Sequence, residues 1–342
     1  MVRKQGKQTY ITENMPSIIS YASIGGKKES EGPMAAGFDM MDTDTTFGTE
    51  TWEKAESRMV TMTVKKAIEK AGLTESDIPC VFAGDLLNQC VGTTFGLRDI
   101  GIPMLGIYGA CSTMSQGILM ASLMVESKVM PRAMAVTSSH FCTAERQYRF
   151  PLEYGSVRPP TSQWTATAAG AVIIEEGIKP PFIKAVTIGT VEDLGVTDQN
   201  NRGAAMAPAA AKTITQFFKD TNKTPDNFDL IATGNLGLVG SELLIELAAR
   251  SGFQIKSKHI DCGLLIYDRE KQDVHAGGSG CGCSAAVLCS YLIPSLREGK
   301  IKDLLFVATG ALLSPTTVQQ KESIPSIAHL VWLSSSKGGL QL

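Results

Sequence analysis

Two cysteine-containing turns hold the residues of this chain that are best suited to chemistry. They read GACS at 109–112 and GCGCS at 280–284, and each is followed by a long uncharged segment. A thiol at a helix N-terminus has a lowered pKa, because unpaired amides and the helix dipole favour the thiolate. Cys111 is therefore a candidate nucleophile, and the alternative is a small buried thiol that packs a tight turn. The same helix N-termini are candidate anion sites.

The chain repeats one order of elements twice, and this order positions the two turns. In the first copy the expected strands and helices are 81–85, 86–98, 104–108, the uncharged helix after Cys111, and 133–137. In the second copy they are 230–235, 241–250, the uncharged helix from the Cys283 turn to residue 296, and 304–309. Strands that alternate with helices predict an α/β fold with parallel-rich sheets. We expect two βαβαβ-containing halves, 1–180 and 181–342, related by a pseudo-two-fold axis.

Ligands of such sheets bind at the carboxyl ends of strands, where both cysteine turns are expected. Under the pseudo-two-fold arrangement these turns meet Asp85 and Asn235 in one cleft. Arg146 and Arg149 are further donors, although each is equally consistent with an ion pair to Glu145 or Glu153. The predicted ligand-binding residues are Asp85, Asn88, Cys111, Ser112, Ser139, His140, Arg146, Arg149, Asn235, Ser279, Cys283 and Ser284.

Composition excludes several classes of protein. The 342 residues are 43% hydrophobic, which is enough for a large globular core. A net charge of −2 and the lack of a Lys/Arg block argue against nucleic-acid binding. Eight irregularly placed cysteines and the lack of a signal-peptide pattern at 1–10 favour free thiols in a reducing compartment. The uncharged stretches 100–125 and 274–296 are long enough for membrane spans, but their internal turns predict buried helices, so we expect no transmembrane helix.

Segments outside the repeat are scaffold or loops. We predict an amphipathic helix at 52–71 closed by Gly72, a surface loop at 32–48, and a strand at 327–333. The excursion at 138–160 mixes charged and aromatic residues without a period, which is typical of a functional loop over a cleft or of a dimer contact.

This organisation resembles the thiolase fold, in which a nucleophilic cysteine opens the buried helix of the first half. More narrowly, the chain resembles the stage V sporulation protein AD family of endospore-forming bacteria, through AGDLLNQ at 83–89, GACST at 109–113, TAERQ at 143–147, DCGLLIY at 261–267 and TGALLSP at 309–315. The resemblance implies a layered α-β-α-β-α body, a homodimer, and binding of dipicolinic acid (pyridine-2,6-dicarboxylate) during its uptake into the spore. It also implies a forespore or spore protein, peripheral to the inner spore membrane through other proteins of the transport system.

The residues argue against condensation chemistry, which needs a base and oxyanion donors besides the thiolate. The histidine and asparagine of Cys-His-Asn ketoacyl synthases align, to within about one residue, with Gly234 and Gly282. His140 and His275 are the histidines closest to the expected cleft, and His259 and His329 are peripheral. We therefore predict a binding protein without catalysis. An acyltransferase that uses Cys111, and a structural transport subunit with an empty cleft, remain the alternatives.

No cofactor is expected, and a resident metal is disfavoured because the spacing of Cys281 and Cys283 is too tight for a zinc knuckle. Calcium can accompany dipicolinate as its chelate, and whether Asp85 or Asp261 contacts that ion stays open. Two helix N-termini that meet in one cleft suit a planar dianion whose two carboxylates are themselves related by a two-fold axis.

Overall fold

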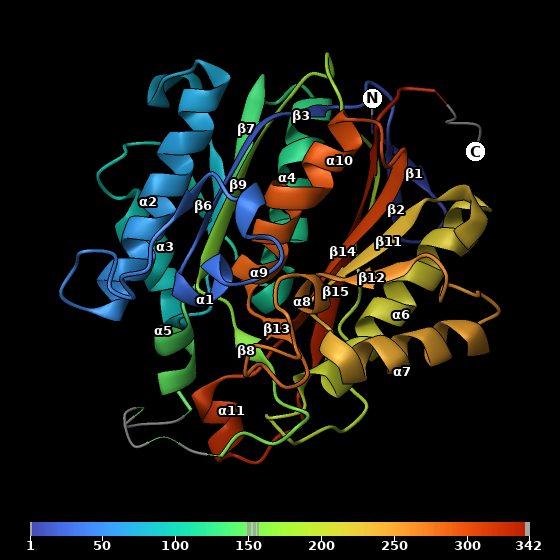
Figure 1. Cartoon of the computed structure of the whole chain (residues 1–342). Helices are drawn as coiled ribbons and strands as arrows, with labels where there is room; N and C mark the ends of the chain where they lie inside the picture. The colour runs from blue at the N-terminus through green and yellow to red at the C-terminus, as the bar shows by residue number, and fades with distance from the viewer. Residues whose placement is uncertain (1, 149–151, 153–154, 156, 339–342) are drawn as a thin grey trace.

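A five-stranded mixed sheet forms the framework of the first half (Figure 1). The computed structural model describes residues 2–338 apart from 149–151, 153–154 and 156. The strands of this sheet are, in spatial order, β3 (Ser17–Gly25), β9 (Ala168–Glu175), β7 (Arg132–Ser139), β5 (Val81–Gly84) and β6 (Met104–Gly106). Its helices are α2 (Trp52–Ala71), α3 (Val91–Leu97) and α4 (Thr113–Glu126).

The second half repeats this arrangement strand for strand. Its sheet runs β10 (Phe182–Thr187), β15 (Ser326–Ser334), β14 (Asp303–Ala311), β11 (Leu230–Gly234) and β12 (His259–Asp261). Its helices are α6 (Arg202–Thr221), α7 (Gly237–Arg250) and a composite helix made of α9 (Cys281–Val287), the π-helical turn η7 (Leu288–Leu292) and α10 (Ile293–Arg297). The two sheets join through one residue pair between β10 and β3, Phe182 with Ser17. Residue 180 lies in the connection between β9 and β10.

Five layers result, and Figure 1 shows them from left to right. Helix α2 covers the outer face of the first sheet, and α6 covers the outer face of the second. Helices α4 and α9 lie between the sheets and contact strands of both. This burial explains why 100–125 and 274–296 carry no charge, because ionised side chains there would be desolvated. Among the described residues, no helix has the length and apolar character needed to cross a bilayer.

Several predicted boundaries are confirmed. Helix α2 spans 52–71, begins at the N-cap Thr51, whose side chain accepts from the Lys54 amide, and ends at Gly72 with φ +67°. The strand expected at 327–333 is β15. The helix expected from residue 86 begins only at Val91, because Gln89 and Cys90 adopt left-handed φ values of +56° and +53°. The second-half helix expected from residue 241 begins earlier, at Gly237.

Both halves also contain short strands and helices besides the elements given above. The segment predicted as a loop at 32–48 contains β4 (Met40–Met41) and a 3₁₀ turn at Ala35–Gly37. The excursion at 138–160 begins with the end of β7 and α5 (Phe141–Arg146), and part of the rest lies outside the described residues. The other short elements are β1 (Val2–Gln5), β2 (Thr9–Thr12), β8 (Trp164–Thr165), β13 (Gly278–Ser279), α1 (Lys27–Ser30), α8 (Cys262–Leu265), α11 (Pro315–Gln319) and the 3₁₀ turns Glu75–Asp77, Asn88–Cys90, Ala110–Ser112 and Pro225–Asn227.

Candidate functional site

The first cysteine turn is a tight bend that leads into α4. Ala110 has φ +48°, a left-handed conformation that is uncommon for a residue with a side chain. Strand β14 packs directly against this bend, because a Cβ atom at Gly310 would lie 2.0 Å from the Gly109 carbonyl oxygen. The bend places Cys111 at the N-terminal end of α4, where the residue is 7% exposed.

The Cys111 thiol lies among uncharged polar groups. Its Sγ is 3.9 Å from Ser279 Oγ, and it also interacts with the Gly280 amide and the Asn235 side chain. Asn235 Nδ2 donates to the Gly280 carbonyl at 2.5 Å, while its buried Oδ1 has no partner among the described residues. Burial raises the pKa of Cys111, and the nearby Arg202 only partly opposes this. The thiol is therefore neutral near pH 7, contrary to the activated thiolate that a helix N-terminus alone predicts.

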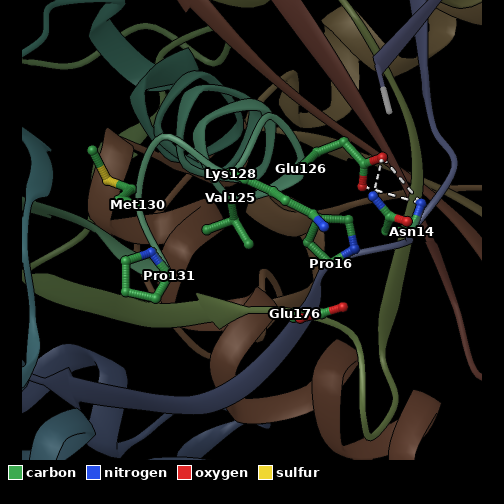
Figure 2. A pocket seen from close by; sticks show the side chains of 8 residues that line it. All are labelled: Asn14, Pro16, Val125, Glu126, Lys128, Met130, Pro131 and Glu176. Atoms are coloured by element: carbon green, nitrogen blue, oxygen red, sulfur yellow. Dashed lines mark hydrogen bonds between the residues drawn. The ribbon is translucent and has the colours of Figure 1, made fainter.

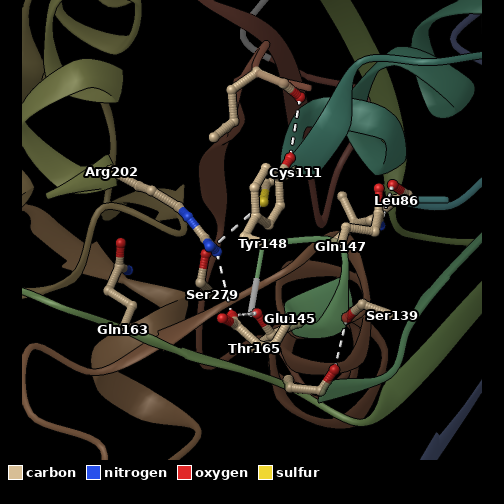
Figure 3. Close-up of polar contacts among 12 residues, drawn as sticks. Leu86, Cys111, Ser139, Glu145, Gln147, Tyr148, Gln163, Thr165, Arg202 and Ser279 are labelled. Atoms are coloured by element: carbon tan, nitrogen blue, oxygen red, sulfur yellow. Dashed lines mark hydrogen bonds and ion pairs between the residues drawn. The ribbon is translucent and has the colours of Figure 1, made fainter. Parts of the chain in front are cut away.

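A narrow cleft of about 40 Å³ opens beside Cys111. Figure 3 shows polar contacts around the cleft, and Arg202 is the cationic residue labelled there. Arg202 is the first residue of α6, and its Nη1 lies 3.5 Å from Oε1 of Glu145, which also accepts from Thr165 Oγ1 at 2.8 Å. The cleft is lined by Leu86, Tyr108, Ala110, Cys111, Ala144, Gln147, Tyr148, Arg202, Met206, Ala311 and Leu313.

Electrostatics in the cleft centre on Arg202. Burial lowers its pKa, but Glu145, Tyr148 and Cys111 act in the opposite direction and the net pKa is raised. Burial raises the pKa of Tyr148 and of Tyr108, so both phenols stay neutral. The buried Arg202 Nε has no hydrogen-bond partner within the described part of the chain. The cleft thus presents one permanent positive charge with an unused donor among apolar and aromatic walls.

Three of the predicted residues meet here, namely Cys111, Asn235 and Ser279. Ser112 is adjacent, but its hydroxyl donates to the Gly109 carbonyl at 2.7 Å. Asp85 is fully buried and accepts from the Leu87 amide at 2.8 Å and the Thr93 amide at 2.7 Å, so it shapes the loop before α3. This explains the delayed start of that helix.

The remaining predicted residues point elsewhere. Ser139 donates to the Ala166 carbonyl at 2.7 Å, Ser284 donates to the Cys281 carbonyl at 3.4 Å, and Cys283 is buried against Gly278. Asn88 is exposed, and Arg146 pairs with Glu53 at 2.6 Å. Arg149 lies outside the described residues.

His140 is held in a separate pocket. Its Nδ1 accepts from the Cys142 amide at 3.2 Å, so its Nε2–H donates to the Thr45 carbonyl at 2.8 Å. Burial lowers the pKa of His140, which is consistent with this neutral tautomer.

The glycines aligned with the ketoacyl-synthase histidine and asparagine have no room for side chains. A Cβ atom at Gly234 would lie 2.4 Å from Ser284 Cβ, and one at Gly282 would lie 2.0 Å from the Ala168 carbonyl oxygen. The turns instead present Asn235 and Ser279 to Cys111, each close in sequence to the aligned position.

The other histidines are engaged elsewhere. His259 hydrogen-bonds to Thr233 at 2.8 Å, His275 lies 3.4 Å from Asp273, and His329 accepts from the Gly189 amide at 3.3 Å. None of these contacts includes the Cys111 thiol.

A pair of buried carboxyl groups lies behind the cysteine turns. Glu56 of α2 hydrogen-bonds to Ser138 Oγ at 3.0 Å and Thr143 Oγ1 at 2.5 Å. Gly92 separates it from Asp85, since a Cβ atom there would be 3.2 Å from Glu56 Cγ and 3.3 Å from Asp85 Oδ2. Burial, together with the Asp85 charge, raises the pKa of Glu56 to about 8.

A second cavity, of about 310 Å³, lies at the opposite end of α4 (Figure 2). Its walls are mainly apolar, and the Glu126 carboxylate there accepts from the Asn14 amide at 3.0 Å. A 14-residue helix is about 20 Å long, so this cavity is remote from Cys111. In the part of the chain that the structure describes, no three His, Cys, Asp or Glu side chains are grouped to hold a metal ion.

The sequence does not predict Arg202, Glu145 or Tyr148 as residues of the site, although it indicates Glu145 as an ion-pair partner of Arg146 or Arg149. Arg202 lies far in sequence from both cysteine turns, and only the packing of α6 against β14 and β15 brings it to the cleft. One local signal existed. Asn201 caps α6, and a basic residue in the first turn of a helix is disfavoured by the dipole. A basic residue such as Arg202, placed in the first turn of a helix although the helix dipole disfavours it there, is a candidate functional residue.

The raised pKa of Cys111 predicts slow alkylation. At pH 7.5, iodoacetamide should modify the partly exposed Cys142 before Cys111, because only the thiolate reacts and Cys111 is buried and neutral. Intact mass and peptide mapping would measure the order. Faster labelling of Cys111 than of Cys142 would contradict this account of the thiol.

Comparisons with known proteins identify relatives of this chain. The family model for stage V sporulation protein AD matches residues 6–334. Stage V sporulation protein AD of Bacillus subtilis (strain 168) is 46% identical over 333 residues, covering 97% of this chain and 98% of the relative.

Two solved structures share the fold at low identity. 3-Oxoacyl-[acyl-carrier-protein] synthase III from Aquifex aeolicus VF5 has a TM-score of 0.55 at 14% identity, covering 93% of this chain and 99% of its own. OleA of Xanthomonas campestris with bound acetamide has a TM-score of 0.58 at 14% identity, covering 97% of this chain and 100% of its own. The thiolase-like α/β fold expected from the sequence is thereby confirmed.

Proposed function

The chain belongs to the stage V sporulation protein AD family, and we propose that it binds dipicolinic acid in the cleft at Cys111 and supports uptake of this acid into the developing spore. The observation that carries the proposal is Arg202, a buried guanidinium with an unused Nε donor at the cleft. Arginine suits a carboxylate because its planar fork forms paired, charge-assisted hydrogen bonds.

Two helix dipoles support the same ligand. The N-terminus of α4 follows Cys111, and α6 begins at Arg202, so the positive ends of both helices meet at the cleft. One carboxylate is expected on Arg202 and the other near the α4 N-terminus. The N-terminus of α9 is also close, because its N-cap Gly280 contacts Cys111, so α6 adds to the sequence-based pair of α4 and α9. The neutral aromatic walls, Tyr108 and Tyr148, suit the planar ring.

The cleft must open to admit this ligand. A volume of about 40 Å³ holds about one water molecule. Two side chains on its rim are held by single long hydrogen bonds, from Tyr148 Oη to the Leu313 carbonyl and from Gln147 Nε2 to the Leu86 carbonyl, both at 3.3 Å. Rotation of these side chains costs little and widens the entrance. The acid enters alone or as its calcium chelate, and titrations with and without calcium distinguish the two forms.

Two charge-neutralising variants with opposite expected effects test the proposal. Arg202→Met should weaken dipicolinate binding about 10- to 100-fold, the equivalent of a charge-assisted hydrogen bond. Glu145→Gln should strengthen it about fivefold, because it removes a carboxylate 3.5 Å from Arg202 and keeps an acceptor for Thr165. Calorimetry would measure both. Equal dipicolinate affinities in the two variants would contradict the proposal. Absence of binding heat with the parent protein at millimolar dipicolinate would also contradict it, and would favour a structural subunit with an empty cleft.

The acyltransferase alternative rests on Cys111 and the fold shared with condensing enzymes. A neutral thiol beside Asn235 and Ser279 lacks the general base that acyl transfer needs. We therefore propose that acyl coenzyme A leaves no adduct on the protein. A stoichiometric acyl mass shift that disappears in Cys111→Ser would favour the enzyme.

The proposal includes a homodimer that forms along β6. This strand ends the first sheet, and Leu105, Tyr108 and Phe95 nearby are exposed by 47%, 47% and 53%. An unpaired apolar edge favours antiparallel pairing with a second copy, which would also cover Tyr108 at the cleft. Light scattering should give the dimer mass, and Leu105→Lys should give the monomer. Attachment to the inner spore membrane through partner proteins is proposed on family membership alone.

A further inference from the structure

A third cavity, of about 360 Å³, lies between α1 and α5. Lys28, Phe141 and Trp164 line it, and Arg158 lies over the Trp164 ring beside it; we call these four residues the Trp164 slot. The slot and the Cys111 cleft lie on opposite sides of β8. Trp164 faces the slot, whereas the next residue, Thr165, donates to Glu145 beside Arg202. Successive side chains of a strand point to opposite faces, so these are two separate sites.

Two cations share one face of the Trp164 ring. The Phe141 ring stacks on the indole with a centroid distance of 3.7 Å and an interplanar angle of 8°, which covers the other face. Lys28 Nζ lies 4.2 Å and Arg158 Cζ 4.9 Å from the indole centroid, and neither fits between rings stacked this closely. The ammonium and the guanidinium therefore converge over the open face. Like charges held this close repel unless an anion joins them.

The charges already present do not satisfy this pair. Arg158 is 10% exposed at its side chain, and its Nη2 donates to Asp273 Oδ2 at 2.6 Å. Its buried Nη1 has no hydrogen-bond partner among the described residues. Lys28 forms no ion pair within the described part of the chain. Burial lowers its pKa, Asp273 raises it and Arg158 lowers it, with smaller raising effects from Glu29 and Glu31 of the cavity wall. The Glu29 carboxyl at the cavity wall is engaged by Tyr267 and the Thr167 amide, and burial raises its pKa.

From this geometry we infer that the Trp164 slot is a second ligand site, which binds the carboxylate of a small aromatic acid between Lys28 Nζ and Arg158 Nη1. The anion satisfies the unused Nη1 donor and relieves the repulsion between the two cations. The aromatic part of the acid packs against the Trp164 and Phe141 side chains, in a cavity of the size that small ligands occupy. The site goes beyond the proposed function, because it binds its ligand whether or not the Cys111 cleft is occupied.

The probe for this site is isophthalate, a benzene dicarboxylate without the pyridine nitrogen. Lys28→Met and Arg158→Met should each weaken its binding at least tenfold by calorimetry. Lys27→Met is the matched control, because Lys27 lines the same cavity without lying over the indole ring, and it should change the affinity less than threefold. If Arg158→Met fails to fold, Arg158→Lys replaces it in the test. Lysine keeps the positive charge but lacks the Nη1 donor, so this variant should also weaken isophthalate binding. Cys111→Trp should leave isophthalate binding in the slot unchanged.

Tryptophan fluorescence and the binding of a ring-free dicarboxylate test the Trp164 slot further. Isophthalate should change the tryptophan fluorescence of the parent protein, and this change should vanish in Trp164→Phe, which retains a ring for Phe141 to stack on. Glutarate, with two carboxylates but no ring, should bind at least fivefold more weakly. Equal binding of glutarate would overturn the aromatic-acid assignment. Unchanged isophthalate affinity in both Lys28→Met and Arg158→Met would overturn the site itself, while loss of binding in Cys111→Trp would assign the signal to the cleft.

Discussion

Cys111→Trp, measured in an Arg158→Met background that removes binding in the Trp164 slot, should reduce dipicolinate binding by at least 100-fold while the protein remains folded. The cleft beside Cys111 measures about 40 Å³, so an indole placed there leaves no space for a second ring. Cys111→Ala removes one weak contact and should weaken binding only about fivefold, the equivalent of about 1 kcal/mol. Calorimetry on both variants separates exclusion by volume from loss of a contact.

Tryptophan substitutions at other positions distinguish filling of the cleft from unfolding of the protein. Lys219→Trp places the same bulk on an exposed residue in the last turn of α6, away from both the cleft and the Trp164 slot, and should bind like the parent protein. Leu86→Trp fills the cleft from its partly exposed rim, and serves where the buried Cys111 site does not tolerate the larger side chain. Unchanged affinity in folded Cys111→Trp and Leu86→Trp proteins would place the dipicolinate site elsewhere in the molecule.

The order of elements was predictable because each signal is local. The apolar stripe of α2 and the cap at Gly72 are properties of consecutive residues, and so is the lack of charge in α4 and the α9–α10 segment. Helix starts were less predictable. The carboxylates of Asp85 and Asp261 bind backbone amides of the turns after β5 and β11, and these contacts fix where α3 and α7 begin.

Pseudo-symmetry predicted the strand order but not the details of the two cysteine turns. In the first turn, the left-handed Ala110 leaves Cys111 at the cleft. In the second, α9 begins directly at Cys281, so Cys283 lies within the helix and is buried against Gly278. The second half therefore contributes Ser279 and Asn235 instead of a matching cysteine. The two motifs alone do not specify this difference in backbone conformation.

The largest expected effect on stability concerns Glu56. Its pKa is raised from 4.5 to about 8 by burial and by the neighbouring Asp85, so the folded protein holds Glu56 protonated at pH 7 while the unfolded chain ionises it. A raised folded pKa contributes stability that is fully present below pH 4.5 and is lost as the pH rises toward 8. The free energy of unfolding should therefore fall across this range.

Glu56→Gln should remove this pH dependence. Glutamine reproduces the protonated acid, because its oxygen accepts from Ser138 and its amide can donate to Thr143 Oγ1, whose own proton is then donated to the His140 carbonyl. Relative to the parent protein, the variant should gain about 2–4 kcal/mol of stability between pH 5 and pH 8. Urea unfolding at both pH values would measure the gain. Glu69→Gln, on the exposed face of the same helix, is the matched control and should follow the parent profile.

The comparison isolates Glu56 from other titrating groups. Burial raises the pKa of Asp261 to about 6, and Asp85 is also raised, but both carboxyls are present in the parent and in each variant. Asp85 accepts two backbone amides, so it is the member of the pair that carries the negative charge when one proton is shared. Removing the ionisable group from Glu56 leaves that charge and the loop before α3 in place. Parallel stability profiles for Glu56→Gln and the parent protein would show that Glu56 is already ionised in the folded state, and that the buried pair holds two charges.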